Sequence, residues 1–230
     1  EFRRVLFRSN DWNVMPDHTV RIYAELKKKG IPCMAYFHQG GHGGPPPLPL
    51  MNRWFTRFLY GIDNGVEKDP KAWIVREGDK MSEPTKYADY PNPDAAPVTL
   101  YPHSGGNGVG ALGKDAGKGQ KPEKLIDDVA IAGAKLAAAE QSPNRLIYAT
   151  APLTEPVHIS GTSRVKVRLS CNKPATNLTV WLVQLPQIER GKINENLITR
   201  GWADPQNHKS LTKGDPLKPR SEEHTSELQS

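Results

Sequence analysis

Apolar and polar positions follow a helical and then an extended pattern in the first third of the chain. From residue 16 to 29 apolar residues recur at helical spacing, lysines gather in the last turn, and Gly30 follows, which predicts a helix. Residues 31–37 form a short apolar run that predicts a strand covered on both faces. Residues 48–60 return to helical spacing and end at Gly61. This order of helix, strand, loop and helix is typical of α/β proteins.

The remaining two thirds of the chain predict β structure. Short segments rich in β-branched and aromatic residues are separated by proline, glycine and asparagine. In RVKVRLSC, residues 164–171, apolar and polar residues alternate, so one face of the strand is expected inside and the other outside. The series predicts a β-sandwich that is incomplete at Pro219. The expected strands are residues 72–77, 98–101, 146–150, 157–161, 164–171, 177–185 and 197–202.

The DNA sequences that can encode the two ends of the chain are reverse complements of each other. The chain begins EFRRVLFRS and ends RSEEHTSELQS. One back-translation of RSEEHTSEL has a reverse complement that encodes EFRRVLFRS, as expected when the same sequencing adaptor is joined to both ends of a DNA fragment. We therefore expect residues 1–9 and 220–230 to be adaptor-derived and not native. The native piece is then 10–219, and neither of its ends is expected to be a natural terminus.

Composition argues against two classes of partner. The chain carries 31 basic and 25 acidic residues, a net charge of +6, and 7% aromatic residues. The lysines gather at the end of the first helix and in the glycine-rich stretch 114–124, whereas nucleic-acid binding needs a basic face with stacking aromatics. No apolar run in the native piece approaches the roughly 20 residues of a membrane-spanning helix. We expect neither a nucleic-acid nor a membrane partner.

Two further patterns have simple structural interpretations. Cys33 and Cys171 form no disulfide framework and no CxxC pair, so both are expected as buried free thiols, and the redox compartment stays open. The run GVGALG, residues 108–113, matches the GxGxxG dinucleotide motif. It follows no convincing strand and opens no amphipathic helix, so we interpret it as part of a glycine-rich loop.

Candidate chemistry lies in the α/β part. Asp11 directly precedes the first expected helix, and His42 lies in the loop after the next strand. In α/β hydrolases the triad residues follow the order serine, acid, histidine, with the acid and the histidine after successive strands. A serine hydroxyl becomes a good nucleophile when an imidazole takes its proton and a carboxylate orients that imidazole. Asp11 and His42 have the order and element types of such a pair, the alternative for His42 being a solvated loop histidine.

The run HQGGH also allows a metal hypothesis. His38 and His42 could bind zinc if they lay four residues apart on a helix. The four glycines around them disfavour a helix, and no third ligand lies nearby in the sequence. We therefore expect no metal, a structural role for His38 at the end of its strand, and a catalytic role for His42.

Three motifs carry a resemblance to a known family. They are NDWNV at residues 10–14, HQGGHGGPPP with MNRWFTRFLYG behind it, and IYATAPLTEPVHISG before the β-rich part. Together they resemble bacterial Xaa-Pro dipeptidyl-peptidases, in the serine-peptidase family that also holds cocaine esterase and α-amino-acid ester hydrolases. The resemblance implies a fold of class α/β plus all-β. Residues 10–66 would be the end of an α/β-hydrolase catalytic domain, and 67–219 an incomplete C-terminal jelly-roll β-sandwich.

The resemblance also implies roles for single residues. Asp11 would be the triad acid and His42 the triad base. Asn13 would donate to the carbonyl of the substrate's penultimate residue, and Val14 would line the proline pocket, unless it only packs at the helix entry. The G-x-S-x-G nucleophile elbow is absent, so the chain alone is expected to be inactive.

The implied activity concerns the parent protein. It would be a serine exopeptidase that releases N-terminal Xaa-Pro dipeptides from proline-containing peptides through an acyl-enzyme, without metal or organic cofactor. Two alternatives remain open. One is an ester or amide acylase of the same family, and the other is a non-catalytic β-sandwich binding protein.

Overall fold

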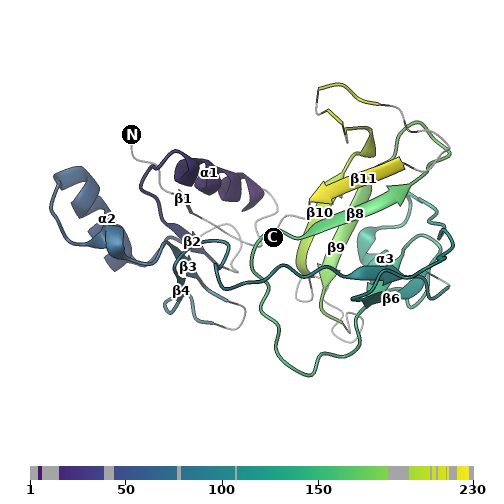
Figure 1. The fold of residues 1–230 in the computed structure, drawn as a ribbon, viewed down its shortest axis with the longest axis horizontal. Helices are drawn as coiled ribbons and strands as arrows, with labels where there is room; N and C mark the ends of the chain where they lie inside the picture. The colour runs from purple at the N-terminus through teal and green to yellow at the C-terminus, as the bar shows by residue number, and fades with distance from the viewer. Residues whose placement is uncertain are drawn as a thin grey trace. The chain divides into compact units, whose positions relative to one another are not determined.

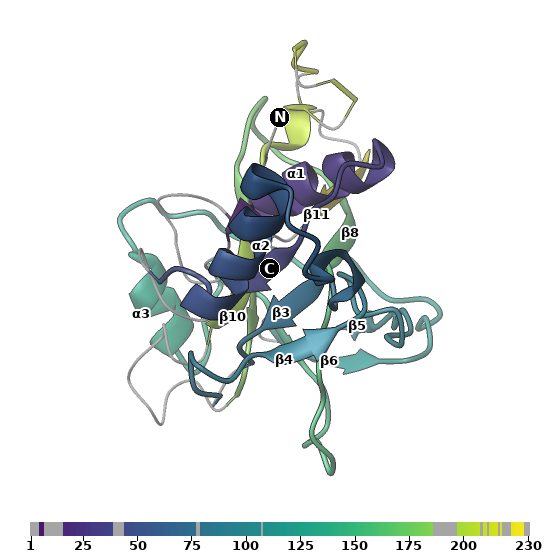
Figure 2. The same cartoon turned by 90° about the vertical axis from the view of Figure 1, so that its left-hand side faces the viewer.

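The chain forms two compact units, drawn in Figures 1 and 2 from a computed structural model. Unit 1 comprises Glu1–Ala95, Ser160–Leu169 and Glu222–Ser230, and unit 2 comprises Ala96–Ile159 and Ser170–Ser221. Strands outnumber helices in the described part of the chain. The structure describes residues 5–6, 16–38, 44–76, 79–106, 108–185, 197–207, 209–210, 212–215, 217 and 222–227.

A four-stranded sheet in the order β1-β2-β3-β4 forms the centre of unit 1. The pairs β1/β2 and β2/β3 are parallel, and β4 pairs with β3 in the antiparallel sense. Helices α1 and α2 connect the successive parallel strands, as the first third of the sequence predicts. The bounds are β1 Val5–Leu6, α1 Pro16–Lys28, β2 Ala35–Phe37, α2 Leu48–Tyr60, η1 Val66–Lys68, β3 Ala72–Ile74 and β4 Thr85–Tyr87.

Helix α1 packs against β2 through an apolar cluster. Tyr23 and Leu26 of the helix meet Cys33, Ala35 and Phe37 from the β2 region, and all five are buried. The helical spacing of apolar residues places Tyr23 and Leu26 on one face, so this face is removed from water. Burial raises the pKa of the Cys33 thiol, which keeps it protonated, in agreement with the expected buried free thiol.

Helix α2 ends where its sequence predicts and is fixed by polar contacts. Gly61 has a φ of 72°, the left-handed conformation that glycine adopts without strain, and its N–H donates to the Arg57 carbonyl. Arg57 Nε also pairs with Glu67 Oε1 of η1 at 2.5 Å, and this hydrogen bond lowers the pKa of Glu67. Arg53 binds the Asp69 carboxylate and the Asn64 carbonyl. These contacts connect α2 to the segment that leads into β3.

Unit 1 also contains an antiparallel pair of β8, Arg164–Leu169, and β11, Glu222–Glu227. In β8 the charged residues Arg164, Lys166 and Arg168 are exposed and the residues between them are half-buried, which confirms the predicted alternation. Both β1 and β11 lie in segments for which the sequence predicts an adaptor origin. The hydrogen bonds that pair these strands with β2 and β8 join backbone N–H and C=O groups, and any non-proline residue provides both.

Unit 2 contains two small sheets. Strand β6 pairs with β5 in the antiparallel sense and with β7 in the parallel sense. Strands β9 and β10 form an antiparallel pair with an irregularity between Leu197 and Thr199. The bounds are β5 Tyr101–His103, β6 Val109–Gly113, α3 Gly133–Ala138, β7 Ile147–Ala149, β9 Leu178–Val183, β10 Leu197–Ala203 and η2 Pro205–Asn207.

Several sequence predictions are wrong at the level of single elements. The GVGALG run lies largely in β6 and not in a loop, because its glycines permit close approach between strands: a Cβ on Gly110 would lie 2.2 Å from the His103 carbonyl oxygen. Residues 157–161 form no strand, and β4 was not expected. Cys171 is half-exposed and not buried.

No helix in the described part of the chain is long and apolar enough to cross a membrane.

Candidate active site

The four residues with predicted site roles, Asp11, Asn13, Val14 and His42, lie outside the described residues. The structure does describe the elements on both sides of them. Strand β1 ends at Leu6 before Asp11, and α1 begins at Pro16 after it. Strand β2 ends at Phe37 before His42.

The two strands that precede these residues are parallel neighbours. The register pairs Val5 with Ala35 and Leu6 with Tyr36. Asp11 and His42 follow their strands at the same sequence separation, from 6 to 11 and from 37 to 42. The carboxyl ends of adjacent parallel strands meet at one edge of a sheet, which is where sites form in α/β proteins. The carboxyl ends of β1 and β2 lie at one such edge, and β1 itself belongs to the segment that is expected to be adaptor-derived.

His38 lies at this edge, directly after β2, with 0% of its surface exposed. Its ring centroid is 5.7 Å from that of Tyr36 on the same strand. The Tyr36 hydroxyl donates a hydrogen bond to the Met81 carbonyl at 3.0 Å. Burial raises the pKa of Tyr36, so its phenol stays protonated and remains a donor. The fully buried imidazole of His38 thus lies beside a buried tyrosine whose hydroxyl donates to another residue.

Gly44, where the described chain resumes, lies against the same imidazole. Its φ is +99°, and a Cβ added there would lie 3.2 Å from His38 Cε1 and 3.3 Å from His38 Nε2. The same Cβ would lie 3.1 Å from the Met81 Cε atom. A side chain at Gly44 would therefore meet both steric crowding and backbone strain. The sequence gives no signal that separates Gly44 from the neighbouring glycines, because the need for glycine at this position comes from a packing contact.

The described residues contain no group of three or more histidine, cysteine or acidic side chains arranged to hold a metal. His42 lies outside this search, so the expectation of no zinc at HQGGH stays a prediction.

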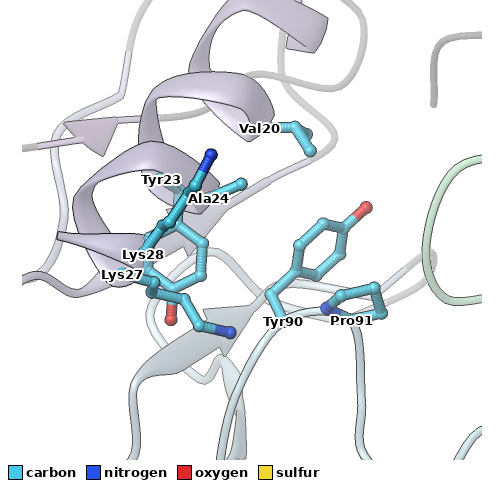
Figure 3. Close-up of a pocket in the computed structure, with 7 residues that line it drawn as sticks. All are labelled: Val20, Tyr23, Ala24, Lys27, Lys28, Tyr90 and Pro91. Carbon is cyan, nitrogen blue, oxygen red and sulfur yellow. The ribbon is translucent and has the colours of Figure 1, made fainter. Parts of the chain in front are cut away.

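A separate hollow lies beside α1, between the helix and the Tyr90–Pro91 segment (Figure 3). Its volume is about 430 Å³. Figure 3 shows Tyr90 and Pro91 facing the helix across this space. The lining is mainly apolar, and its two charged residues lie in the last turn of α1. The lining residues are Val20, Tyr23, Ala24, Lys27, Lys28, Tyr90 and Pro91.

A polar network lies next to this hollow and connects α1 to the segment after β4. The Tyr23 hydroxyl donates to Asp89 Oδ1 at 2.7 Å, Lys27 Nζ donates to Asp89 Oδ2, and the Tyr90 N–H donates to Oδ1 at 2.7 Å. Desolvation raises the pKa of Asp89, but these three hydrogen bonds outweigh it and hold the pKa below its usual value. The Lys27 charge is neutralised by Asp89, so the network fits a structural role. The sequence gives no sign of it, since Tyr23 and Asp89 are 66 positions apart.

The lowered pKa of Asp89 predicts a pH dependence of stability. A carboxyl group with a folded pKa below its unfolded value of about 3.9 stabilises the fold fully above that value, and this contribution is lost as pH falls through the folded pKa. We expect Asp89→Asn to lower the free energy of unfolding by about 1–2 kcal/mol at pH 7, since hydrogen bonds to a partly exposed charge are lost. The difference from the unsubstituted chain should shrink toward pH 3.

Urea unfolding of the two chains at pH 7, 5 and 3 measures this difference. Lys80→Gln is the matched control, because Lys80 is exposed and pairs with Glu83 only at 3.4 Å. A difference between Asp89→Asn and the unsubstituted chain that stays constant from pH 7 to pH 3 would contradict the assignment.

The architecture of the whole chain is found in solved hydrolases. An aminopeptidase from a marine-sediment Thaumarchaeota archaeon superposes with a TM-score of 0.67 at 14% identity, covering 98% of this chain and 44% of the archaeal one. An α-amino acid ester hydrolase gives a TM-score of 0.63 at 16% identity, covering 99% and 45%. At these identities the likeness establishes the fold alone. The mostly-sheet chain with few helices thus has the fold of hydrolases of the CocE/NonD type.

The chain belongs to the family described as X-Pro dipeptidyl-peptidase C-terminal non-catalytic domain, whose model matches residues 64–221. A Rhodopirellula baltica protein, named provisionally as an Xaa-Pro dipeptidyl-peptidase, is 53% identical over 212 residues, which are 91% of this chain and 34% of the relative. An Xaa-Pro dipeptidyl-peptidase of Lactobacillus delbrueckii subsp. bulgaricus is 28% identical over 214 residues, 84% of this chain and 26% of the relative. These matches confirm the resemblance to Xaa-Pro dipeptidyl-peptidases that the sequence motifs indicate.

The chain spans about a third of the length of the Rhodopirellula baltica relative. Asp11 and His42 both precede residue 64, where the non-catalytic family match begins. The candidate site therefore lies outside the segment that the family description calls non-catalytic.

Proposed function

We propose that this chain is part of a serine exopeptidase that releases N-terminal Xaa-Pro dipeptides. Asp11 and His42 serve as the acid and base of its triad, and the serine comes from a segment outside this chain. The observation that carries the proposal is the 53% identity over 212 residues to the Rhodopirellula baltica protein, and in the sequence His42 follows β2, as a triad histidine follows its strand. The family match and the relatives named as Xaa-Pro dipeptidyl-peptidases supply the substrate class.

The chemistry follows from the roles of the two residues. His42 takes the proton of the serine hydroxyl as the oxygen attacks the carbonyl carbon after proline, which forms a tetrahedral adduct. His42 then gives the proton to the leaving amine, so the peptide bond breaks and an acyl-enzyme remains. Water, deprotonated by the same imidazole, releases the dipeptide. Asp11 orients the imidazole and stabilises its charged form in both halves of the reaction.

Asn13 and Val14 provide the substrate contacts of the proposal. The Asn13 amide donates to the carbonyl of the residue before proline, and Val14 contacts the proline ring. Both stand between Asp11 and Pro16, the first residue of α1. A short tether of this kind keeps the substrate contacts close to the triad acid. We further propose that residues 10–66 complete an α/β-hydrolase domain and that 67–219 are an incomplete jelly roll.

A chimera tests the proposal with the residues of this chain. Residues 10–219 replace the aligned part of the Rhodopirellula baltica relative, whose 53% identity favours a folded product. We expect the chimera to hydrolyse Ala-Pro p-nitroanilide with a kcat/KM at least 100-fold above that for Ala-Ala p-nitroanilide. The chain of 230 residues alone should show no turnover, because it has no G-x-S-x-G nucleophile.

The outcomes separate the proposal from its rivals. A preference of the chimera for simple acyl esters over both anilides would favour an ester or amide acylase. A well-folded chimera without any hydrolysis would favour a binding protein. In the described part of the chain the exposed large aromatic side chains Tyr60, Tyr101 and Trp202 belong to α2, β5 and β10, so they do not line one sandwich face. This distribution supports the enzyme over a carbohydrate-binding module.

A further inference from the structure

We infer that the hollow between α1 and the Tyr90–Pro91 segment is a binding site for a small molecule with an apolar body and one carboxylate group. This hollow is called the α1 pocket below. Val20 and Ala24 of α1 form one wall, and Tyr90 and Pro91 form the opposite wall (Figure 3). All of these residues belong to unit 1. The proposed peptidase activity and this binding site depend on different residues, so either can fail alone.

The wall formed by Tyr90 and Pro91 is held in place by contacts behind it. The Tyr90 ring packs against Phe37 with the ring centroids 4.4 Å apart, and the Tyr90 N–H donates to Asp89 Oδ1 at 2.7 Å. A Cβ on Gly161 would lie 3.3 Å from both Cβ and Cγ of Pro91, so the chain at Gly161 closely backs the proline ring. Pockets for small molecules are usually formed in advance by such fixed apolar walls and have volumes of roughly 300–1,000 Å³. The volume of the α1 pocket, about 430 Å³, lies in this range.

The two lysines that line the α1 pocket differ in how their charges are used. Lys27 Nζ donates to Asp89 and lies 5.4 Å from the centroid of the Tyr23 ring, so its charge is already engaged. Lys28 pairs with Glu25 only at 3.9 Å, and the two side chains are 78% and 62% exposed. An exposed pair of this kind contributes little to stability, so Lys28 can turn to a ligand at low cost.

The charges around the α1 pocket favour a ligand with a single negative charge. Lys28 attracts one anionic group and repels an ammonium group. Asp89 lies beside the pocket, and its lowered pKa keeps it ionised at neutral pH, so it repels a second negative charge on the ligand. Its carboxylate already accepts three hydrogen bonds and is therefore a poor partner for a cationic ligand. The chemistry that fits is an aryl or alkyl monocarboxylate, with its apolar body between the two walls and its carboxylate at Lys28.

Ligand-detected fluorine NMR on the chimera tests the site with para-fluorophenylacetate as the probe. We expect a Kd of about 1 mM or below, in line with the binding energy per atom of small ligands. The neutral para-fluorophenylacetamide should bind about three- to fivefold more weakly, because it lacks the charge that Lys28 attracts. Equal affinity for the carboxylate and the amide would overturn the inference, as would no binding of the carboxylate up to about 10 mM.

Lys28→Gln tests how the carboxylate is recognised. The variant should bind the carboxylate about three- to fivefold more weakly and keep its affinity for the amide within about twofold. Lys29→Gln is the matched control, because Lys29 carries the same charge one residue further on and is not among the lining residues. Its affinity for both probes should stay within about twofold of the unsubstituted chimera. Equal losses in the two variants would indicate only general attraction to a basic surface and would overturn the inference.

Ala24→Trp tests where the probe binds. Ala24 is exposed on α1 and lines the pocket, so an indole at this position fills the space without entering the core. We expect both probes to bind at least about tenfold more weakly, because their apolar body is excluded. Ile22→Trp is the control, since Ile22 is 47% exposed on the same helix and is not among the lining residues. Unchanged binding by an Ala24→Trp chimera with an unaltered urea midpoint would place the probe elsewhere and overturn the inference.

Discussion

Replacing His42 by alanine in the chimera should lower kcat for Ala-Pro p-nitroanilide by about 10⁴-fold or more. The imidazole transfers the proton in both the acylation and the deacylation half-reactions, and loss of a triad base in serine hydrolases has an effect of this size. Much of the substrate binding is independent of proton transfer, so KM should change far less than kcat. Steady-state kinetics at neutral pH measure both values.

His18→Ala is the matched control for this variant. His18 is exposed on α1, seven residues after Asp11, and has no proposed role. Its kcat should stay within about twofold of the unsubstituted chimera. If His42→Ala retained more than about a tenth of the activity, the base would have to be another residue, and His38 would be the next candidate.

Replacing Asp11 by asparagine should lower kcat by roughly 10⁴-fold as well. An amide at this position can hold the imidazole only in the wrong tautomer and cannot stabilise its charged form, so the geometry persists while the chemistry fails. Because the loss lies in general-base function, the chimera should still fold and elute at its normal size. Kinetics and size-exclusion chromatography on the same preparation test both statements.

Asp17→Asn is the control for an acidic side chain in the same region. Asp17 is 6% exposed, lies in the first turn of α1, and pairs with Arg21 Nε at 2.7 Å. Its carboxylate is used within the helix, so the substitution should affect stability and leave kcat within about threefold. A larger catalytic loss for Asp17→Asn than for Asp11→Asn would reassign the triad acid.

The helices of unit 1 could be predicted from the sequence because their signals are local. Helix α2 has the predicted bounds, since helical apolar spacing and a left-handed Gly61 act within a few residues. The end of α1 likewise follows from its terminal lysines and Gly30. Strands depend on partners that are distant in sequence, which explains why β4 was missed and why residues 157–161 form no strand.

The sequence predicts residue types for the candidate site, and it predicts only part of the described surroundings. The strand before His42 could be predicted from the sequence, whereas no native strand before Asp11 is predicted, because residues 1–9 are expected to be adaptor-derived. The close packing of Gly44 against His38 could not be predicted, because it depends on tertiary contacts. The roles of Asp11, Asn13, Val14 and His42 remain predictions, since these residues lie outside the described part of the chain.

The most direct test of the central claim is the identity of the product that the chimera releases from the peptide Ala-Pro-Gly-Phe. Mass spectrometry of the reaction should detect Ala-Pro and Gly-Phe as the initial products in equal amounts, and His42→Ala should abolish both. Release of free alanine first, or undiminished Ala-Pro release by the His42→Ala chimera, would contradict the account.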